Sequence, residues 1–167
     1  PGSIFKVITL AGVLEEGELS PETRLLVPET LFYRGTLIEE AHARDPNVSD
    51  TKTVSEIIQE SLNVGTTLMA KKLGPERLYS YIKRFGFGDK TGVEGMGESR
   101  GLLRPTSSWS KVDLAMHSFG QGVAVTSIQM AAAVSAIAND GVYIKPRLVK
   151  YVTSYDFKTK LAVPIRR

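Results

Sequence analysis

The chain has 167 residues, which is about the length of one domain and enough to bury a substantial core. Hydrophobic residues make up 42% of it and charged residues 23%, which is ordinary for a globular protein. The net charge of +3 is small and the basic residues are dispersed, so nothing indicates a nucleic-acid-binding surface.

Metal and membrane sites are also disfavoured. There is no cysteine, which excludes disulfides and thiolate metal sites, and the two histidines, His42 and His117, are far apart. We therefore expect no metal and no cofactor. No apolar stretch approaches the roughly 20 residues that span a bilayer, and we expect no signal peptide within these residues. The chain begins at Pro1, inside a motif and without an initiator methionine, so we expect it to be part of a larger protein.

The first half of the chain predicts two helices around an irregular segment. An apolar run predicts a helix over residues 4–16 that ends at Gly17. Residues 18–50 are rich in turn formers, and we expect an irregular excursion with one short hairpin. The pattern Thr53-x-x-Glu56 is a capping box and predicts a helix that continues to about Leu62.

The second half predicts three more helices and a β-rich tail. Residues 66–73 form the first, and Pro75 opens the next, whose apolar residues at helical spacing are Leu78, Tyr81, Ile82 and Phe85. Six glycines in residues 86–101 indicate a long loop. A second capping box, Thr126-x-x-Gln129, predicts an alanine-rich helix to about Asn139, and alternation within residues 142–165 suggests strands.

The pattern Ser-x-x-Lys occurs four times, and only its surroundings distinguish the copies. The four pairs are Ser3/Lys6, Ser49/Lys52, Ser80/Lys83 and Ser108/Lys111. Lys6 lies in a helix that is apolar on almost every side, which predicts burial, whereas the other three lysines have polar neighbours. Burial lowers the pKa of a lysine by several units, which is what a general base needs. At this spacing Ser3 and Lys6 share one face of a helix as nucleophile and potential base.

Three segments together resemble the transpeptidase domain of class B penicillin-binding proteins. They are PGSIFK at residues 1–6, SLNVG at residues 61–65 and SFGQG…ANDG at residues 118–141, and their order is more specific than any one of them. The resemblance covers nearly the whole chain. It implies the α/β penicillin-binding and serine β-lactamase-like fold, with this chain, residues 1–167, as a partial domain truncated at both ends. We expect an α-rich structure with an incomplete antiparallel sheet.

The resemblance also implies roles for four residues. Ser3 would attack the carbonyl between two terminal D-alanines of a peptidoglycan stem peptide, and Lys6 would take its proton. Ser61 would pass the proton to the leaving amine, and Asn63 would hydrogen-bond Lys6 and the substrate amide. β-Lactam antibiotics would acylate Ser3. The glycines of Gly120-Gln121-Gly122 are expected to allow close packing beside the active-site helix rather than chemistry.

Lys90-Thr91-Gly92 matches the family's third motif, Lys-Thr-Gly, but lies in the glycine-rich loop before the Gly-Gln-Gly segment. The catalytic tripeptide of the family follows that segment on a strand, so we expect this copy to be a look-alike and the true motif to lie beyond Arg167. Without that strand one oxyanion-hole donor is lost, which lowers the rate about 10²–10³-fold. Lys6 should then be more exposed to water, and the isolated chain a poor catalyst.

Two alternatives share some of these features. One is a serine β-lactamase or β-lactam sensor, although the region of Glu94 and Glu98 does not resemble a deacylating loop. The other is a non-catalytic module that binds cell-wall peptide or division proteins, which the intact motif residues disfavour. The resemblance further implies partners in the cell-wall synthesis machinery and a place on the extracytoplasmic face of the bacterial cytoplasmic membrane, with the anchor outside this chain.

Overall fold

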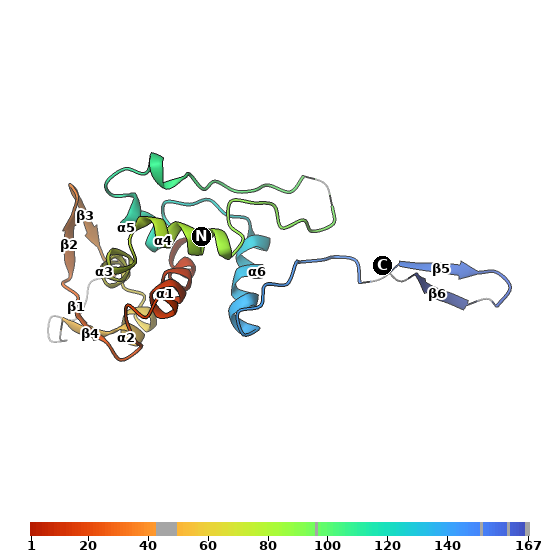
Figure 1. Cartoon of the computed structure of the whole chain (residues 1–167), viewed down its shortest axis with the longest axis horizontal. Helices are drawn as coiled ribbons and strands as arrows, with labels where there is room; N and C mark the ends of the chain where they lie inside the picture. Colours follow the sequence, from red (N-terminus) through yellow and green to blue (C-terminus); the bar gives the residue numbers. More distant parts are fainter. Residues whose placement is uncertain (43–49, 96, 151, 160, 166–167) are drawn as a thin grey trace.

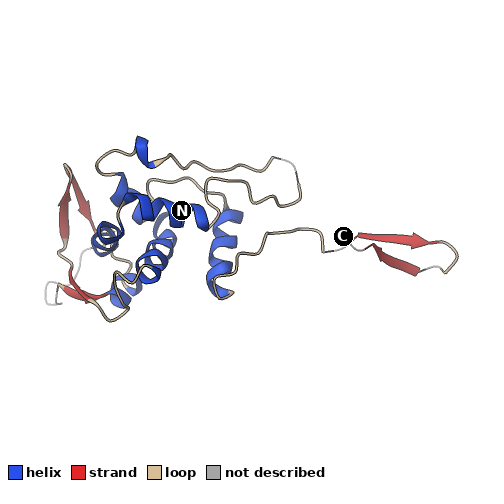
Figure 2. Ribbon diagram, in the orientation of Figure 1, coloured by secondary structure: helices blue, strands red, loops and turns tan. Residues whose placement is uncertain are grey.

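A body of six α-helices carries three small antiparallel strand pairs in the computed structural model, which describes residues 1–42, 50–95, 97–150, 152–159 and 161–165 (Figures 1 and 2). The helices are α1 (Lys6–Glu15), α2 (Val54–Gln59), α3 (Asn63–Leu73), α4 (Pro75–Arg84), α5 (Asp113–Ser118) and α6 (Ser127–Ala138). The strands are β1 (Arg24–Leu26), β2 (Thr30–Tyr33), β3 (Thr36–Glu39), β4 (Thr51–Thr53), β5 (Val152–Asp156) and β6 (Leu161–Ile165). Short 3₁₀ turns are η1 (Gly2–Phe5) and η2 (Thr106–Ser108).

The capping signals locate helix starts well. Thr53 and Thr126 each accept a hydrogen bond from the backbone N–H three residues on, and their own backbone N–H groups donate to the side-chain oxygens of Glu56 and Gln129, so both predicted capping boxes are confirmed. The first helix is preceded by the η1 turn and ends at Glu15. The second ends at Gln59 rather than Leu62, and α3 begins at Asn63 rather than Thr66.

The segment expected to be irregular contains a hairpin and a long-range strand pair. Strands β2 and β3 form the hairpin, with Thr30 opposite Glu39, and β1 pairs with β4 across the excursion, with Arg24 opposite Thr53. Residues 43–49, which include Ser49 of one Ser-x-x-Lys match, lie outside the described residues. The residue directly after β3 is Glu40, whose side chain contacts the start of α3.

The core is built around α1. This helix packs against α3 and α4 (Figure 1). Phe5, the last residue of η1, and Ile8 of α1 are both fully buried. The largest buried apolar partners from the other elements are Ile57, Met69, Leu73, Leu78, Ile82 and Phe87. Each such side chain contributes about 1.5–3 kcal/mol on burial, so the active-site end of α1 is held rigidly.

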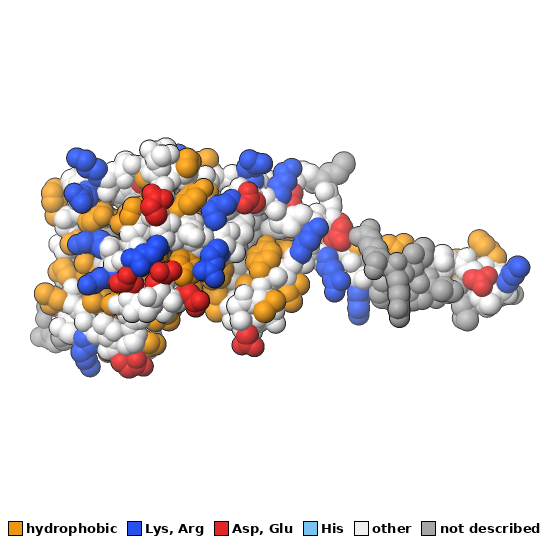
Figure 3. Space-filling model, in the orientation of Figure 1, with side chains coloured by type: hydrophobic (Ala, Val, Ile, Leu, Met, Phe, Trp, Pro, Cys, Tyr) orange, Lys and Arg blue, Asp and Glu red, His pale blue; other side chains and the backbone are white. Residues whose placement is uncertain are grey.

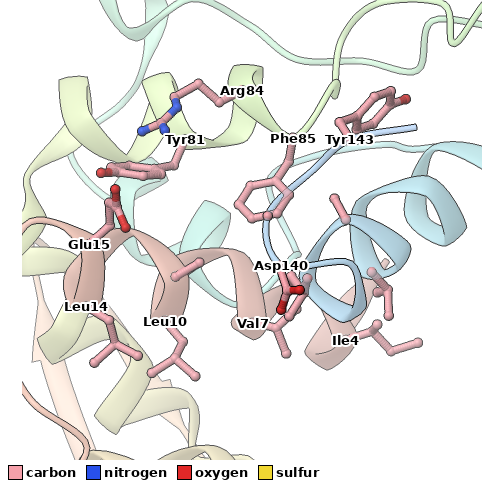
Figure 4. Close-up of a pocket in the computed structure, with 15 residues that line it drawn as sticks. Ile4, Val7, Leu10, Leu14, Glu15, Tyr81, Arg84, Phe85, Asp140 and Tyr143 are labelled. Carbon is pink, nitrogen blue, oxygen red and sulfur yellow. The ribbon is translucent and has the colours of Figure 1, made fainter. Parts of the chain in front are cut away.

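Another face of α1 is only half-buried, whereas its apolar sequence predicts burial on almost every side. Ile4 is 60% exposed, and an open groove of about 950 Å³ runs between α1, α4 and α6. Figure 4 shows Val7, Leu10 and Leu14 along one wall of it, and Figure 3 shows hydrophobic side chains at the surface beside α6. The residues that line the groove do not include the four candidate catalytic residues.

Two features of the C-terminal half differ from expectation. The short helix α5 was not predicted, because its six residues carry no clear helical period. The expected strands of the tail are confirmed only beyond residue 151: β5 and β6 form a hairpin that projects away from the helical body after an extended segment (Figure 1).

Candidate active site

The start of α1 separates Ser3 and Lys6 by one turn but places them in different surroundings. Ser3 lies in the η1 turn and is exposed, whereas Lys6 is the first residue of α1 and is 2% exposed. The backbone N–H of Lys6 donates to the Ser3 carbonyl, which fixes the turn. Within the described residues the Ser3 hydroxyl makes no hydrogen bond to the Lys6 amine. Ser3 is thus accessible, whereas Lys6 is enclosed.

Burial does not by itself distinguish Lys6, and the sequence interpretation was wrong on this point. Lys52, taken to lie in polar surroundings, is only 5% exposed because Glu60 neutralises it through an ion pair of 2.7 Å. Lys83 and Lys111 are half-buried and exposed, respectively. What distinguishes Lys6 is burial without an ion pair to any carboxylate in the described part of the chain.

Ser61 lies in a strained turn at the end of α2. Its N–H donates to Ile58 and that of Leu62 donates to Ile57, at 3.1 and 2.9 Å. This pair of bonds is the Schellman arrangement, which requires a left-handed residue at the position of Ser61 and usually has glycine there. Ser61 has a φ of +57°, unfavourable for a residue with a side chain. Strain of this kind is found where the surroundings impose a particular direction on the backbone.

The strained turn directs Ser61 at the lysine. The Lys6 ammonium donates to the Ser61 carbonyl and, at 3.2 Å, to the Ser61 hydroxyl. Burial lowers the pKa of Lys6 from its usual 10.5 to about 8, while the negative charge of Glu40 partly opposes that effect. Roughly one molecule in ten then has a neutral amine at pH 7, against about one in three thousand for an unperturbed lysine. In these 167 residues Lys6 is enclosed, as the apolar sequence around it predicts.

Asn63 lies beside this pair, but its side chain is engaged elsewhere. Its Nδ2 donates to the Glu39 carbonyl at 2.9 Å, and the expected hydrogen bond to Lys6 is not present among the described contacts. Its backbone N–H donates to the Glu40 carboxylate. Sequence reasoning missed Glu40, because it lies 23 residues before Asn63 and belongs to no motif.

The Gly-Gln-Gly segment packs directly on the turn that carries Ser3. The N–H of Gly2 donates to the Gly120 carbonyl at 3.1 Å, and Thr9 donates to the Ser118 carbonyl at 2.8 Å. A Cβ on Gly120 would lie 2.3 Å from the Gly2 carbonyl oxygen, and the φ of Gly120 is +80°. The expectation that these glycines serve close packing beside the active-site helix is confirmed for Gly120.

Lys90-Thr91-Gly92 is held in its loop by one carboxylate. The N–H and hydroxyl of Thr91 each donate to Glu98 at 2.6 Å, and the N–H of Gly92 donates to it at 2.9 Å. These bonds lower the pKa of Glu98, the Thr91 hydroxyl contributing most. In the described ranges this tripeptide belongs to a loop rather than to a strand.

Other kinds of site find no support in the described part of the chain. No cluster of three metal-ligating side chains occurs there, and no helix is long and apolar enough to cross a membrane. The candidate site thus consists of Ser3 just before α1, the buried Lys6 with its lowered pKa, and Ser61, whose hydroxyl contacts Lys6.

A serine one helical turn from a buried lysine is a candidate pair of nucleophile and base, and comparison with known proteins identifies the family. The model of the penicillin-binding protein transpeptidase domain matches residues 1–165. The chain belongs to this family. Penicillin-binding protein PbpB of Mycolicibacterium smegmatis is 37% identical over 158 residues, which is 93% of the chain and 24% of that protein. Stage V sporulation protein D of Bacillus subtilis is 40% identical over 153 residues, 90% of the chain and 23% of that protein.

Solved structures of penicillin-binding proteins share the fold. Penicillin-binding protein 3 of Mycobacterium tuberculosis, in complex with aztreonam, superposes with a TM-score of 0.87 at 34% identity. The match covers 100% of the present chain and 36% of the chain in that structure. The same protein was also solved with ampicillin. The expected transpeptidase fold is thus confirmed, in a chain that spans about a quarter of the length of its curated relatives.

Proposed function

We propose that this chain carries the nucleophile and the base of a peptidoglycan D,D-transpeptidase. The observation that carries the proposal is the buried Lys6, with a pKa of about 8, held on Ser61 one turn from an exposed Ser3. Membership of the transpeptidase family supports the reaction class. The substrate proposed is a stem peptide that ends in D-Ala-D-Ala, and β-lactams would react at the same serine.

The proposed reaction gives each proton a path. The Ser3 oxygen attacks the carbonyl carbon of the penultimate D-alanine while its proton passes to neutral Lys6. Ser61, bonded to Lys6, relays a proton to the nitrogen of the departing D-alanine, which leaves an ester on Ser3. The amine of a second stem peptide then attacks that ester, forms the crosslink and returns the proton to Ser3. Asn63 would position the substrate amide once its side chain leaves the Glu39 carbonyl.

The remaining parts of the site would come from outside these 167 residues. The Ser3 N–H would serve as one oxyanion donor, and a strand with the catalytic Lys-Thr-Gly motif would supply the other. Without the second donor the rate falls about 10²–10³-fold, so we expect the 167 residues alone to be inactive or severely impaired. The complete protein would work with the cell-wall synthesis machinery at the outer face of the cytoplasmic membrane.

Labelling by penicillin tests the proposal. A full-length protein that contains these residues should acquire one labelled penicillin on the peptide with Ser3, and its Ser3→Ala variant none. It should also crosslink a D-Ala-D-Ala donor to an amine acceptor. Rapid turnover of a chromogenic cephalosporin would instead identify a β-lactamase. A Ser3→Ala protein that still supported wall synthesis in cells would indicate a non-catalytic module.

A further inference from the structure

Glu40 belongs to none of the motifs, yet it connects the end of β3, the start of α3 and Lys6. It directly follows β3 and is half-buried. Its carboxylate accepts from the backbone N–H of Asn63 and, at 3.0 Å, from that of Val64. These are the first two residues of α3, whose own N-cap, Leu62, provides no side-chain acceptor. Glu40 therefore caps α3 from a distant part of the chain.

The cap holds the turn in which Ser61 lies. An anionic acceptor at a helix start satisfies orphan N–H groups and favours the positive end of the helix dipole. The neighbouring Glu39 carbonyl adds a third bond, to the Asn63 side chain, so the end of β3 is attached to both the backbone and the side chain of Asn63. Because Ser61 precedes Asn63 by two residues, the same attachment restrains the left-handed turn that faces Lys6.

Glu40 also acts on Lys6 through its charge. Its carboxylate is close enough to raise the pKa of the buried lysine against the larger effect of desolvation. The negative charge thus limits how far burial neutralises the base. Glu40 forms none of the described ion pairs. Its negative charge therefore acts mainly on the N-terminus of α3, to which it is hydrogen-bonded, and on Lys6.

We infer that Glu40 is a positioning residue for the proposed transpeptidase site, which orients the Ser61–Asn63 turn and sets the charge balance of Lys6. This inference rests on the proposed function only for its effect on acylation. Its effect on the lysine and on the amides of α3 can be measured without any substrate.

The first experiment titrates Lys6 by NMR, with ¹³C-labelled lysine and the signal assigned by its absence in Lys6→Arg. In Glu40→Gln we expect the midpoint to fall below about 8, by about half a unit or more, because the raising charge is lost. Glu29→Gln removes the same charge from an exposed turn and should leave the midpoint unchanged. A folded Glu40→Gln protein with the wild-type midpoint would overturn the charge role.

The second experiment keeps the inference testable if Glu40→Gln fails to fold. Glu40→Asp retains the charge but is one methylene shorter, so it should keep the Lys6 midpoint near that of wild type while the Asn63 and Val64 amides exchange with solvent several-fold faster. Exchange as slow as in wild type would contradict the capping role.

The third experiment measures penicillin acylation against pH in the full-length protein. For Glu40→Gln we expect the acidic limb to shift to lower pH, since Lys6 stays neutral further down, and the plateau to fall several-fold because the turn is less restrained. A lower plateau with no shift would show a merely structural cap. If wild type itself is not acylated at any pH, the proposed function fails, whereas the Lys6 titration still decides the role of Glu40.

Discussion

The Lys6 ammonium donates to both the carbonyl and the hydroxyl of Ser61, and the left-handed backbone of Ser61 is what turns both oxygens toward it. An extended or helical residue at this position could not close the α2 terminus and face Lys6 in the same way. The turn therefore combines backbone strain at Ser61 with a fixed contact to Lys6, the base of the proposed reaction.

Replacing Ser61 separates the strain from the hydroxyl. Ser61→Ala keeps the unfavourable φ and loses the hydroxyl, whereas Ser61→Gly loses both. We expect Ser61→Gly to be more stable than Ser61→Ala by about 1 kcal/mol in urea unfolding, because glycine adopts the left-handed region freely. Both variants should lose most penicillin acylation in the full-length protein. Equal stabilities would show that the turn is unstrained.

The buried lysine should make stability depend on alkaline pH. The unfolded chain keeps Lys6 protonated to about 10.5, whereas the folded protein releases the proton at about 8, so the unfolded state binds more protons between these values. The free energy of unfolding of wild type, relative to Lys6→Met, should therefore rise between pH 8 and 10.5, by as much as about 3 kcal/mol. Urea unfolding at several pH values measures it, and a constant difference would contradict it.

Local signals explain which parts of the fold could be predicted. The two capping boxes involve residues three apart, so the starts of α2 and α6 follow from the sequence alone. The Schellman turn at Ser61 was missed because its left-handed position lacks the glycine that announces such a turn. The extension of α3 back to Asn63 was missed because its cap, Glu40, comes from another element.

In the site, too, local motifs were predictable and contacts between distant elements were not. Ser3, Lys6, Ser61 and Asn63 were proposed from motif order, and the fold brings Lys6 and Ser61 into contact. Pairing between different elements was not predictable: Lys52 of β4 is buried and forms an ion pair with Glu60 at the end of α2. The hydrophobic pattern could not show which face of α1 is fully covered, since both faces are apolar and one of them borders the open groove.

Gly120 should be intolerant of even one methyl group. In Gly120→Ala the Cβ would lie 2.3 Å from the Gly2 carbonyl oxygen, in backbone that cannot retreat without moving the Ser3 turn. Gly141→Ala is the matched control, since its φ of +81° is similar but no atom lies within 4 Å. We expect Gly141→Ala to lose about 1 kcal/mol and Gly120→Ala clearly more, with reduced acylation only in the latter. Similar losses in both would argue against the close contact.

His117 should make the fold sensitive to acid. Its ring is fully buried, stacks on Trp109 at 4.0 Å between centroids, and donates from Nδ1 to the Asp113 carbonyl at 2.7 Å. Within the described residues its Nε2 has no hydrogen-bond partner. Desolvation lowers the pKa of His117 below 6.5, so the unfolded chain gains the proton first as pH falls.

The free energy of unfolding should accordingly decrease as pH falls from about 6.5 toward 5. Thermal unfolding across this range measures it. His117→Asn retains a donor near the position of Nδ1 and should flatten the dependence, at the cost of lower stability at neutral pH. His42→Gln, which removes the other, exposed histidine, is the control and should leave the pH dependence of unfolding unchanged. An equally steep pH dependence in His117→Asn would assign the effect to other groups.

Lys90-Thr91-Gly92 has the sequence of the family's third motif but lies in a loop, and we predict that its lysine is not needed for acylation. Lys90 is exposed, and the tripeptide is bonded to Glu98 rather than to Lys6 or Ser61. Lys90→Ala should therefore leave the rate of penicillin acylation of the full-length protein within about twofold, since only a charge outside the site is lost. Thr91→Val, which removes the hydroxyl bonded to Glu98, should lower the melting temperature instead. A loss of acylation in Lys90→Ala comparable to that in Lys6→Met would make the loop lysine catalytic and place the third motif inside this chain.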